Sequence, residues 1–231
     1  MKRFWKDATV EPAQGGWRVL LDGRAVKTQA GSAQVAPTRA LADALAAEWA
    51  AQGETIDPQS LPLRDLADLA IDVIRPDRAG SAAQVLRYGE TDTLCYRAEP
   101  DAPLYARQIE VWEPLLTAAE ARWDVHFERI SGVIHRPQSP ATLARLERVL
   151  AAQDNFSLAA LMTLTSLAAS LVIGLAALEL GADAEALWAA ANLEEDWQIE
   201  LWGEDAEAAT RRARRLCAFA AAQRFAELAR S

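Results

Sequence analysis

The residues best placed to do chemistry are carboxylates near the C-terminal end of the chain. They are Glu194, Glu195, Asp196, Glu200, Glu204, Asp205 and Glu207. Paired carboxylates can perform acid and base catalysis, so a small acidic enzyme that uses the Glu194–Glu207 cluster is one hypothesis. Side chains on a helix meet only at spacings of three and four, so most of these acids would point in different directions. A solvated acidic face is the simpler interpretation.

Two tryptophans and a glutamine are interleaved with these acids. Trp197, Gln198 and Trp202 lie among them, and Gly203 follows where a helix should stop. Tryptophan beside charge can form a protein-binding patch. Trp197 and Leu201, four residues apart, could equally face a core. The segment therefore predicts either a binding surface or an ordinary helix end.

Other catalytic patterns are missing from the sequence. A nucleophilic hydrolase needs a histidine as base, yet His126 lies in an alternating, strand-like run and His135 in a loop before a proline. The sequence contains no Gly-x-Ser-x-Gly elbow, no closely spaced Cys and His for zinc and no Glu-x-x-His pair. Gly15-Gly16 precedes a strand rather than a helix, so it predicts a turn and not a phosphate loop. No metal and no cofactor are expected.

Composition narrows the class of partner. The 231 residues are 51% apolar, which allows a sizeable core, and the formal net charge is -9. Nucleic acid is not expected as a partner, because phosphate binding relies on clustered Lys and Arg. The one basic run, Arg211 to Arg215, begins four residues after Glu207. This spacing predicts a helix face of salt-bridged side chains. The two cysteines are far apart and no secretory leader is recognisable, so a cytoplasmic location is expected.

One uncharged stretch bears on membrane insertion. Phe156 to Leu178 exceeds the roughly 20 apolar residues that span a bilayer, which keeps a membrane-associated protein as a third hypothesis. Serines and threonines dilute the stretch, and it lacks flanking Trp, Tyr, Lys or Arg anchors. We therefore expect one helix buried in a helical core, capped by Asp154 or Asn155 and ended by Gly181, with Gly174 allowing close approach of a neighbour. Stable membrane insertion is not expected.

The first forty residues predict a small antiparallel sheet. Strands are expected at Arg3–Val10, Gly16–Leu21, Ala25–Thr28 and Ala33–Ala36. Asp22-Gly23 predicts a two-residue primed turn that pairs Leu20 and Leu21 with Val26.

The pattern changes from alternating to helical at Thr38. Thr38 is expected to cap a helix that buries Leu41, Leu45 and Trp49 and ends at Gly53. Beyond the extended segment Glu54–Leu61, almost everything is helical in pattern, with brief strands or extended links at Thr93–Arg97 and Val125–Ile130. The helical segments are Leu63–Ile74, Ser81–Gly89, Ala106–Arg122, Pro140–Gln153, Phe156–Leu178, Ala184–Leu201 and Asp205–Ala229. The fold class is α+β: an N-terminal domain over residues 1–60, with an antiparallel β-sheet and a helix, and a larger orthogonal helical bundle over residues 61–231.

Several short blocks occur together in the order of one known family. The stretch Leu193–Glu204 resembles the Q-x-x-x-W-G-E signature of the assembly chaperones for the alpha subunit of F-type ATP synthase, through Gln198, Trp202, Gly203 and Glu204. Other blocks agree with L-D-G-R-x-V-K-T, E-W-x-x-Q, M-P-L, D-x-L-C-Y-R and Q-x-x-x-W-x-P-L; they are Leu21–Thr28, Glu48–Gln52, Leu61–Leu63, Asp92–Arg97, and Gln108 with Trp112–Leu115. Leu61 replaces the usual Met, Arg64 a common Thr, and Trp197 a common Tyr or Phe. After Glu204 the resemblance ends.

The resemblance implies a binding protein and not an enzyme. Such chaperones hold the unassembled alpha subunit until its beta partner arrives, with bacterial members in the cytoplasm and eukaryotic ones in the mitochondrial matrix. The family's important acidic position lies within the C-terminal signature, and Glu195 and Glu200 are our choices. The predicted partner-binding residues are Glu194, Glu195, Asp196, Gln198, Glu200, Trp202 and Glu204. Asp22, Gly23, Trp49, Pro62 and Trp112 are predicted to be structural, and the chain is expected to be monomeric.

Overall fold

The chain forms two compact units. The computed structural model describes residues 2–132, 136–203 and 205–231. Unit 1 comprises residues 1–78, 154–160 and 221–231, and unit 2 comprises residues 79–153 and 161–220. Helices α6 (Asn155–Ala168) and α10 (Ala206–Arg230) contribute residues to both units. The predicted α+β class is confirmed, whereas the predicted domain boundary after residue 60 stays a prediction.

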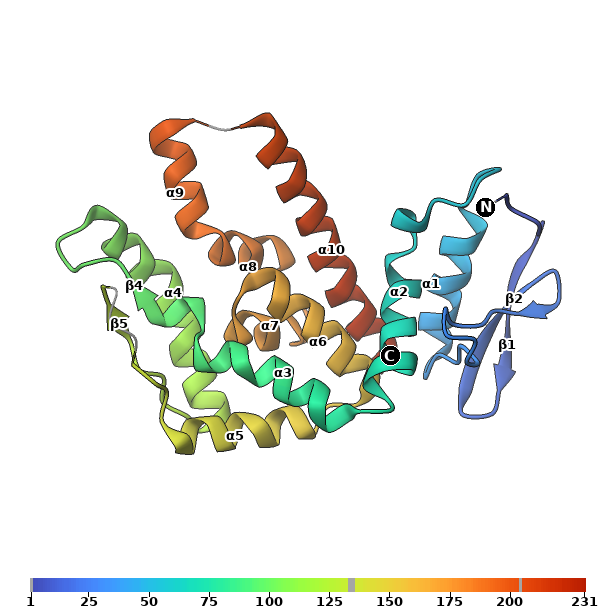
Figure 1. The fold of residues 1–231 in the computed structure, drawn as a ribbon, viewed down its shortest axis with the longest axis horizontal. Coiled ribbons are helices and arrows are strands. Elements are labelled where there is room, and N and C mark those ends of the chain that lie inside the picture. Colours follow the sequence, from blue (N-terminus) through green and yellow to red (C-terminus); the bar gives the residue numbers. More distant parts are fainter. Residues whose placement is uncertain (1, 133–135, 204) are drawn as a thin grey trace. The chain divides into compact units, whose positions relative to one another are not determined.

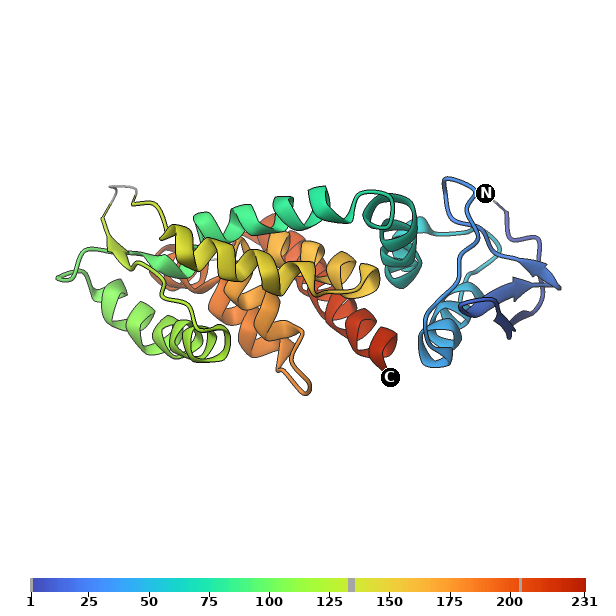
Figure 2. The same cartoon turned by 90° about the horizontal axis from the view of Figure 1, so that it is seen from below.

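Unit 1 holds the antiparallel sheet and the helices that follow it in sequence (Figure 1). These elements are β1 (Ala8–Ala13), β2 (Gly16–Leu21), β3 (Arg24–Ala25), α1 (Arg39–Ala50), the 3-10 turn η1 (Pro58–Ser60), α2 (Pro62–Asp68) and the π-helical turn η2 (Leu69–Ile74). Unit 2 is almost entirely helical, as Figure 2 shows. It contains α3 (Arg78–Glu90), η3 (Thr93–Cys95), β4 (Tyr96–Arg97), α4 (Pro103–Trp123), β5 (Ile130–Ser131), α5 (Pro140–Ala151), α7 (Leu171–Ala177), α8 (Ala184–Ala191) and α9 (Leu193–Trp202), with parts of α6 and α10. The first residue of α3, Arg78, belongs to unit 1.

Strand β2 is the centre of the three-stranded sheet. It pairs antiparallel with β1 on one side and with β3 on the other. Asp22 and Gly23 form the connecting turn at φ 47° and 77°, so the predicted primed turn is confirmed. The predicted register is wrong: a two-residue turn sets Leu21 opposite Arg24 and Leu20 opposite Ala25, not Val26.

Two further strand predictions need correction. The first strand is Ala8–Ala13 and not Arg3–Val10, because Arg3 is held at the end of α1, where its guanidinium donates to the carbonyls of Ala50 and Gln52 at 3.2 and 2.5 Å. The segment Ala33–Ala36 makes only single bridges, to Lys27 and Trp17, and forms no strand. Alternation alone could not reveal that Arg3 has non-local partners.

Helix α1 covers one face of the sheet through the residues that the sequence predicts. Thr38 caps it, since its side chain accepts a hydrogen bond from the Leu41 N–H at 3.1 Å, and Leu41 and Leu45 are buried. The helix ends at Ala50 rather than Gly53. Thr38 also donates to the carbonyl of Leu228, and Phe156 stacks on Phe225 with ring centroids 5.8 Å apart. Parts of α6 and α10 thereby belong to the same core as α1.

The uncharged stretch Phe156–Leu178 is two helices and not one. Helix α6 ends at Ala168, Ala169 adopts φ 50°, and the Ser170 side chain caps α7 by accepting from the Ile173 N–H at 3.1 Å. Asp154 caps α6 as predicted, accepting from the Phe156 N–H at 2.8 Å. A Cβ on Gly174 would collide with Thr165, so the predicted close approach of helices at this glycine is confirmed. Among the described residues, none of the helices combines the length and the apolar character needed to cross a membrane.

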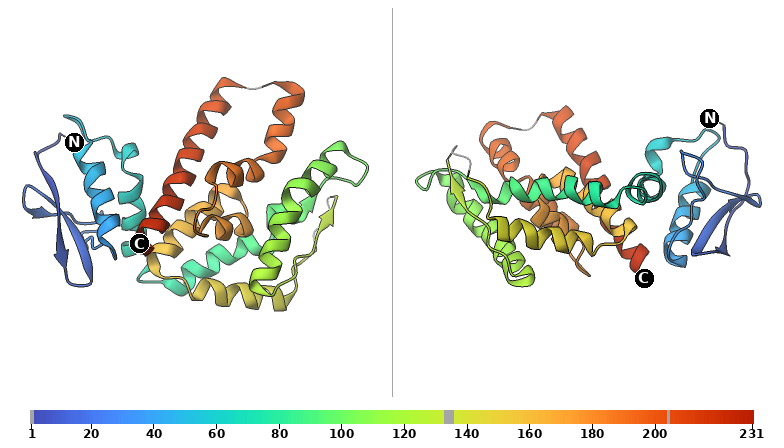
Figure 3. Two further views of the ribbon diagram at one scale, coloured as in Figure 1. Left: turned by 180° about the vertical axis from the view of Figure 1, so that it is seen from behind. Right: turned by 60° about the horizontal axis from the view of Figure 1, so that its bottom comes forward.

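The predicted helix Ala184–Leu201 is also interrupted. Asn192 leaves the helical conformation at φ −109° and ψ 18°, and its side-chain amide donates to the Trp188 carbonyl at 2.8 Å. Because asparagine competes for backbone hydrogen bonds, it can divide a helical pattern without a proline or glycine. Helix α9 is therefore a separate element beside the first half of α10, as Figure 3 shows.

Strands β4 and β5 form a short parallel pair, with Tyr96 opposite Ile130. The extended links predicted at Thr93–Arg97 and Val125–Ile130 contain them only in part, because Thr93–Cys95 is a 3-10 turn and β5 extends to Ser131.

Trp112 should contribute far more to stability than the exposed Trp202. Trp112 is fully buried in unit 2 and its Nε1 donates to the Ala190 carbonyl at 2.8 Å, whereas Trp202 is 78% exposed. We expect Trp112→Ala to lower the free energy of unfolding by about 3–5 kcal/mol and Trp202→Ala to change it by less than about 0.5 kcal/mol. Urea denaturation of both variants measures the difference. Equal losses of free energy of unfolding in the two variants would contradict the burial of Trp112 and the exposure of Trp202.

Candidate functional site

The predicted partner-binding residues between Glu194 and Trp202 lie on α9, a short helix with a charged start and an exposed apolar end. Glu194, Glu195 and Asp196 occupy its first turn, where carboxylates stabilise the positive end of the helix dipole. Gly203 ends it as predicted, at φ 87°, and its N–H donates to the Ile199 carbonyl at 2.8 Å. Leu193 is the buried residue that anchors the helix.

Three of the acids on α9 already have partners within unit 2. Glu194 accepts from the Gln108 side chain at 2.7 Å, Asp196 pairs with Arg212, and Glu200 pairs with Arg107 at 2.6 Å. The hydrogen bond from Arg107 holds the pKa of Glu200 below its usual range, while partial burial raises the pKa of Glu194. Glu194 and Asp196, in the first turn of α9, therefore attach this helix to α4 and α10.

The remaining side chains of the signature are open. Leu201 is 57% exposed and Trp202 78%, and Gln198 is exposed as well. Glu195 is half-buried, and its carboxylate forms no hydrogen bond or ion pair with any residue that the structure describes. Glu195, Gln198 and Trp202 follow the spacing of one helical face. We call these four residues, Glu195, Gln198, Leu201 and Trp202, the α9 surface.

Two predicted positions on the segment differ from this surface. Trp197 is half-buried and lies under Arg107, with the guanidinium 5.8 Å from the ring centroid, so it packs within unit 2. Glu204 lies outside the described residues.

Gln108 holds α9 in place through Glu194, a role that the sequence did not predict. Its side chain is fully buried, accepts from the Ala98 N–H at 2.8 Å and donates to Glu194 at 2.7 Å. Four residues further along α4, Trp112 reaches the last turn of α8 through Ala190. The spacing Gln108–Trp112 was a signal of one helical face, but nothing in the sequence points from that face to Glu194.

The N-terminal blocks hold unit 1 together. Asp22 accepts from the backbone N–H groups of Lys6 and Asp7 at 2.9–3.1 Å. The Glu48 carboxylate accepts from the first N–H groups of α2, those of Leu63 and Arg64, at 2.8 and 2.9 Å. Pro62 occupies the first position of that helix, where no N–H is needed.

Trp49 lies at the surface end of the unit 1 core. It is half-buried, and its ring meets that of Trp5 edge-on with centroids 5.3 Å apart. The predicted packing role fits this contact, although the side chain is less buried than a core tryptophan.

Asp92 is a buried carboxylate that sequence reasoning left without a role. It accepts from the Leu94 N–H at 3.1 Å and the Val172 N–H at 2.9 Å, so it caps η3 and the start of α7 together. Complete burial raises its pKa from 3.8 to about 6, against the opposing effect of these hydrogen bonds. The D-x-L-C-Y-R block is therefore a structural cap in unit 2.

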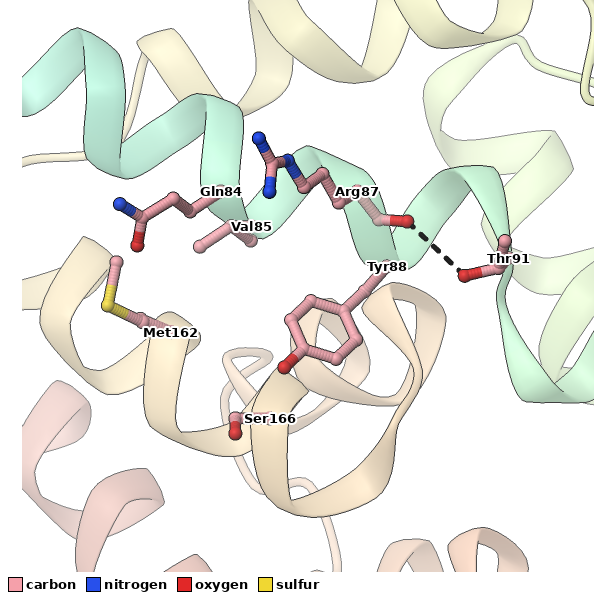
Figure 4. A pocket seen from close by; sticks show the side chains of 7 residues that line it. All are labelled: Gln84, Val85, Arg87, Tyr88, Thr91, Met162 and Ser166. Carbon is pink, nitrogen blue, oxygen red and sulfur yellow. Dashed lines mark hydrogen bonds between the residues drawn. The ribbon is translucent and has the colours of Figure 1, made fainter.

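One pocket lies elsewhere in unit 2, between α3 and α6. It encloses about 550 Å³ and is lined by Gln84, Val85, Arg87, Tyr88, Thr91, Met162 and Ser166 (Figure 4). These seven side chains include no carboxylate, histidine or cysteine. Among the described residues, no group of three or more His, Cys, Asp or Glu side chains could hold a metal ion.

Comparison with known proteins places the chain among chaperones. Residues 2–120 match the model of the ATP12 chaperone protein family. The mitochondrial protein atp12 of Schizosaccharomyces pombe is 28% identical over 219 residues, which cover 89% of this chain and 75% of that protein. The solved structure of Atp12 from Paracoccus denitrificans is similar at a TM-score of 0.92 and 40% identity, covering 99% of this chain and 98% of that one. The Atu1473 protein from Agrobacterium tumefaciens is similar at a TM-score of 0.93 and 42% identity, covering 98% and 85%.

The buried Asp92 should give the protein an unusual pH dependence. A carboxyl whose pKa is raised on folding binds its proton more tightly in the folded state, so its contribution to stability is present below about pH 4 and is lost as the pH rises through about 6. We expect the free energy of unfolding of the wild type, relative to Asp92→Asn, to rise by roughly 1–3 kcal/mol as the pH falls from about 7 to about 4.5.

Asp22→Asn is the matched control. The backbone hydrogen bonds from Asp7 and Lys6 lower the pKa of Asp22, so this carboxylate stays ionised between about pH 4.5 and 7. The difference in free energy of unfolding between the wild type and Asp22→Asn should therefore stay constant over this pH range. Urea denaturation at several pH values measures both differences. A flat profile for Asp92→Asn would contradict the role assigned to burial.

Proposed function

The chain belongs to the ATP12 chaperone family, and on that premise we propose that it binds the unassembled alpha subunit of the F1 sector of ATP synthase. Binding would shield the interface that the alpha subunit exposes before assembly and so promote formation of the F1 complex. Family membership supports a chaperone role in ATP synthase assembly; the alpha subunit as partner is the finer proposal.

The observation that carries the proposal is the α9 surface. A leucine and a tryptophan that are 57% and 78% exposed stand beside acidic side chains at the end of a helix. Soluble proteins rarely leave a large aromatic side chain this open unless it contacts a partner, and tryptophan is enriched among residues that dominate binding energy. We propose that Trp202 is the apolar anchor of the contact.

The acids around Trp202 would set the orientation of the partner. Arg107 keeps Glu200 ionised, and one carboxylate can accept hydrogen bonds from more than one donor, so Glu200 can serve a basic or amide-bearing partner group as well. Glu195 has no ion pair within the described chain and is the second acceptor. Glu194 and Asp196 remain predicted contacts, although both already have internal partners.

Release would follow from competition and would require no cofactor. If the beta subunit buries more of the alpha interface than this chain does, mass action favours the assembled complex. The carboxylate cluster fits this role better than acid and base catalysis, because three of its members are bonded to Gln108, Arg212 and Arg107. A monomeric state and a cytoplasmic location stay predictions.

Substitutions on the α9 surface should weaken binding of the alpha subunit without loss of stability. Trp202→Ala should raise the Kd at least about thirtyfold, which corresponds to an anchor worth about 2 kcal/mol, and Glu195→Gln and Glu200→Gln should each raise it severalfold. Isothermal titration of isolated alpha subunit measures these effects, and circular dichroism checks the fold.

Glu185→Gln supplies the control, because Glu185 is an exposed acid on α8 outside the signature. It should bind as the wild type does. If the wild type binds no alpha subunit, the proposed partner is wrong. If it binds and the three variants bind equally well, the contact lies on another surface.

A further inference from the structure

A second surface with docking chemistry lies in unit 1, at the edge of the three-stranded sheet. A groove of about 360 Å³ is lined there by the apolar side chains of Phe4, Leu21, Val26 and Trp49 and by the cations Arg24 and Lys27. All six residues belong to unit 1, and none belongs to the signature on α9.

The walls of the groove are unusually apolar for an open surface. Leu21 and Val26 are buried, Trp49 is half-buried, and Phe4 is 61% exposed, with its ring edge-on to that of Trp5 and the ring centroids 5.0 Å apart. A volume at the lower end of the range for binding sites accommodates an apolar side chain rather than a whole cofactor.

The cations at the rim lack counter-charges. Arg24 and Lys27 are exposed, and neither forms an ion pair with any residue within 2–132, 136–203 or 205–231. Asp22, the carboxylate nearest in sequence, is already bonded to the Lys6 and Asp7 backbone. In a chain of net charge -9, two unpaired cations beside an apolar groove favour an acidic occupant.

The position of the groove along consecutive residues of the chain favours an extended occupant. Arg24 and Ala25 form β3, which is the last strand in the order β1-β2-β3, and residues 24–27 line the groove consecutively. An extended segment that runs along residues 24–27 would meet their side chains in turn.

We propose that this groove docks an extended, acidic segment of a partner protein, with one aromatic or large aliphatic side chain against Trp49 and Phe4 and carboxylates against Arg24 and Lys27. If the partner is the alpha subunit, the groove is a second contact that deepens the proposed function. Its chemistry does not depend on that identity and is tested separately.

The first test uses model peptides. Fluorescence polarisation would compare a labelled peptide of about eight residues that alternates phenylalanine and glutamate with one that alternates phenylalanine and lysine. The full-length wild type should bind the acidic peptide at least about tenfold more tightly. Arg24→Glu should weaken acidic-peptide binding at least about tenfold, and Phe4→Ala severalfold.

Arg224→Glu is the matched control, since Arg224 is an exposed cation of unit 1 on α10, outside the groove. It makes the same charge change and should leave peptide binding as in the wild type, while circular dichroism verifies that all variants fold. Equal binding of the two peptides, or equal effects of Arg24→Glu and Arg224→Glu, would overturn the proposal.

Two further measurements separate the possible occupants. Binding of isolated alpha subunit to Arg24→Glu tests whether the groove serves the proposed partner. If Arg24→Glu loses peptide binding while the wild type fails to bind alpha subunit, the groove proposal stands and the proposed function is wrong. Sedimentation of the wild type at increasing concentration tests a second copy as occupant. Self-association that Arg24→Glu abolishes would replace the partner segment by another copy and contradict the proposal.

Discussion

The fold depends on hydrogen-bond acceptors for the backbone N–H groups at the starts of its many short helices. Each helix leaves backbone N–H groups unpaired at its start, and burial of such a group without a partner is costly. Some of the missing acceptors come from other elements: Glu48 of α1 serves α2, and the buried Asp92, which caps η3 locally, also serves the start of α7. Gln108 joins two segments as well, because it accepts from the Ala98 N–H and donates to the Glu194 carboxylate on α9. Removing one of these polar groups would therefore disturb two elements rather than one.

This constraint explains why the blocks that resemble the chaperone family are mostly structural. Asp22, Glu48, Asp92, Gln108 and Trp112 all hydrogen-bond the chain itself. The C-terminal signature is structural only in part, since Glu194 and Asp196 attach α9 to its neighbours while Leu201 and Trp202 stay exposed. A rigid helix that presents an exposed aromatic side chain suits a protein that binds without chemistry, because little conformational entropy is lost on contact.

Local patterns in the sequence predicted the elements better than their ends. The Asp22-Gly23 turn, the Thr38 cap, the Asp154 cap and the Gly203 stop were all readable, because each is decided by one residue and its neighbours. The breaks at Ala169 and Asn192 and the first strand were not, because they depend on partners far along the chain or on a left-handed residue that is not glycine. In the candidate site, the sequence singled out the segment that forms α9 but could not tell the bonded Glu194 from the open Glu195, since Gln108 lies 86 residues away.

The most direct test of a holding role is light scattering by alpha subunit diluted from denaturant. An equimolar amount of this protein should suppress the scattering without any nucleotide, and later addition of beta subunit should release alpha into an assembled complex while the solution stays clear. Scattering that rises as fast with this protein as without it would contradict the account. So would suppression that appears only when ATP is supplied, because competition for an exposed interface needs no hydrolysis.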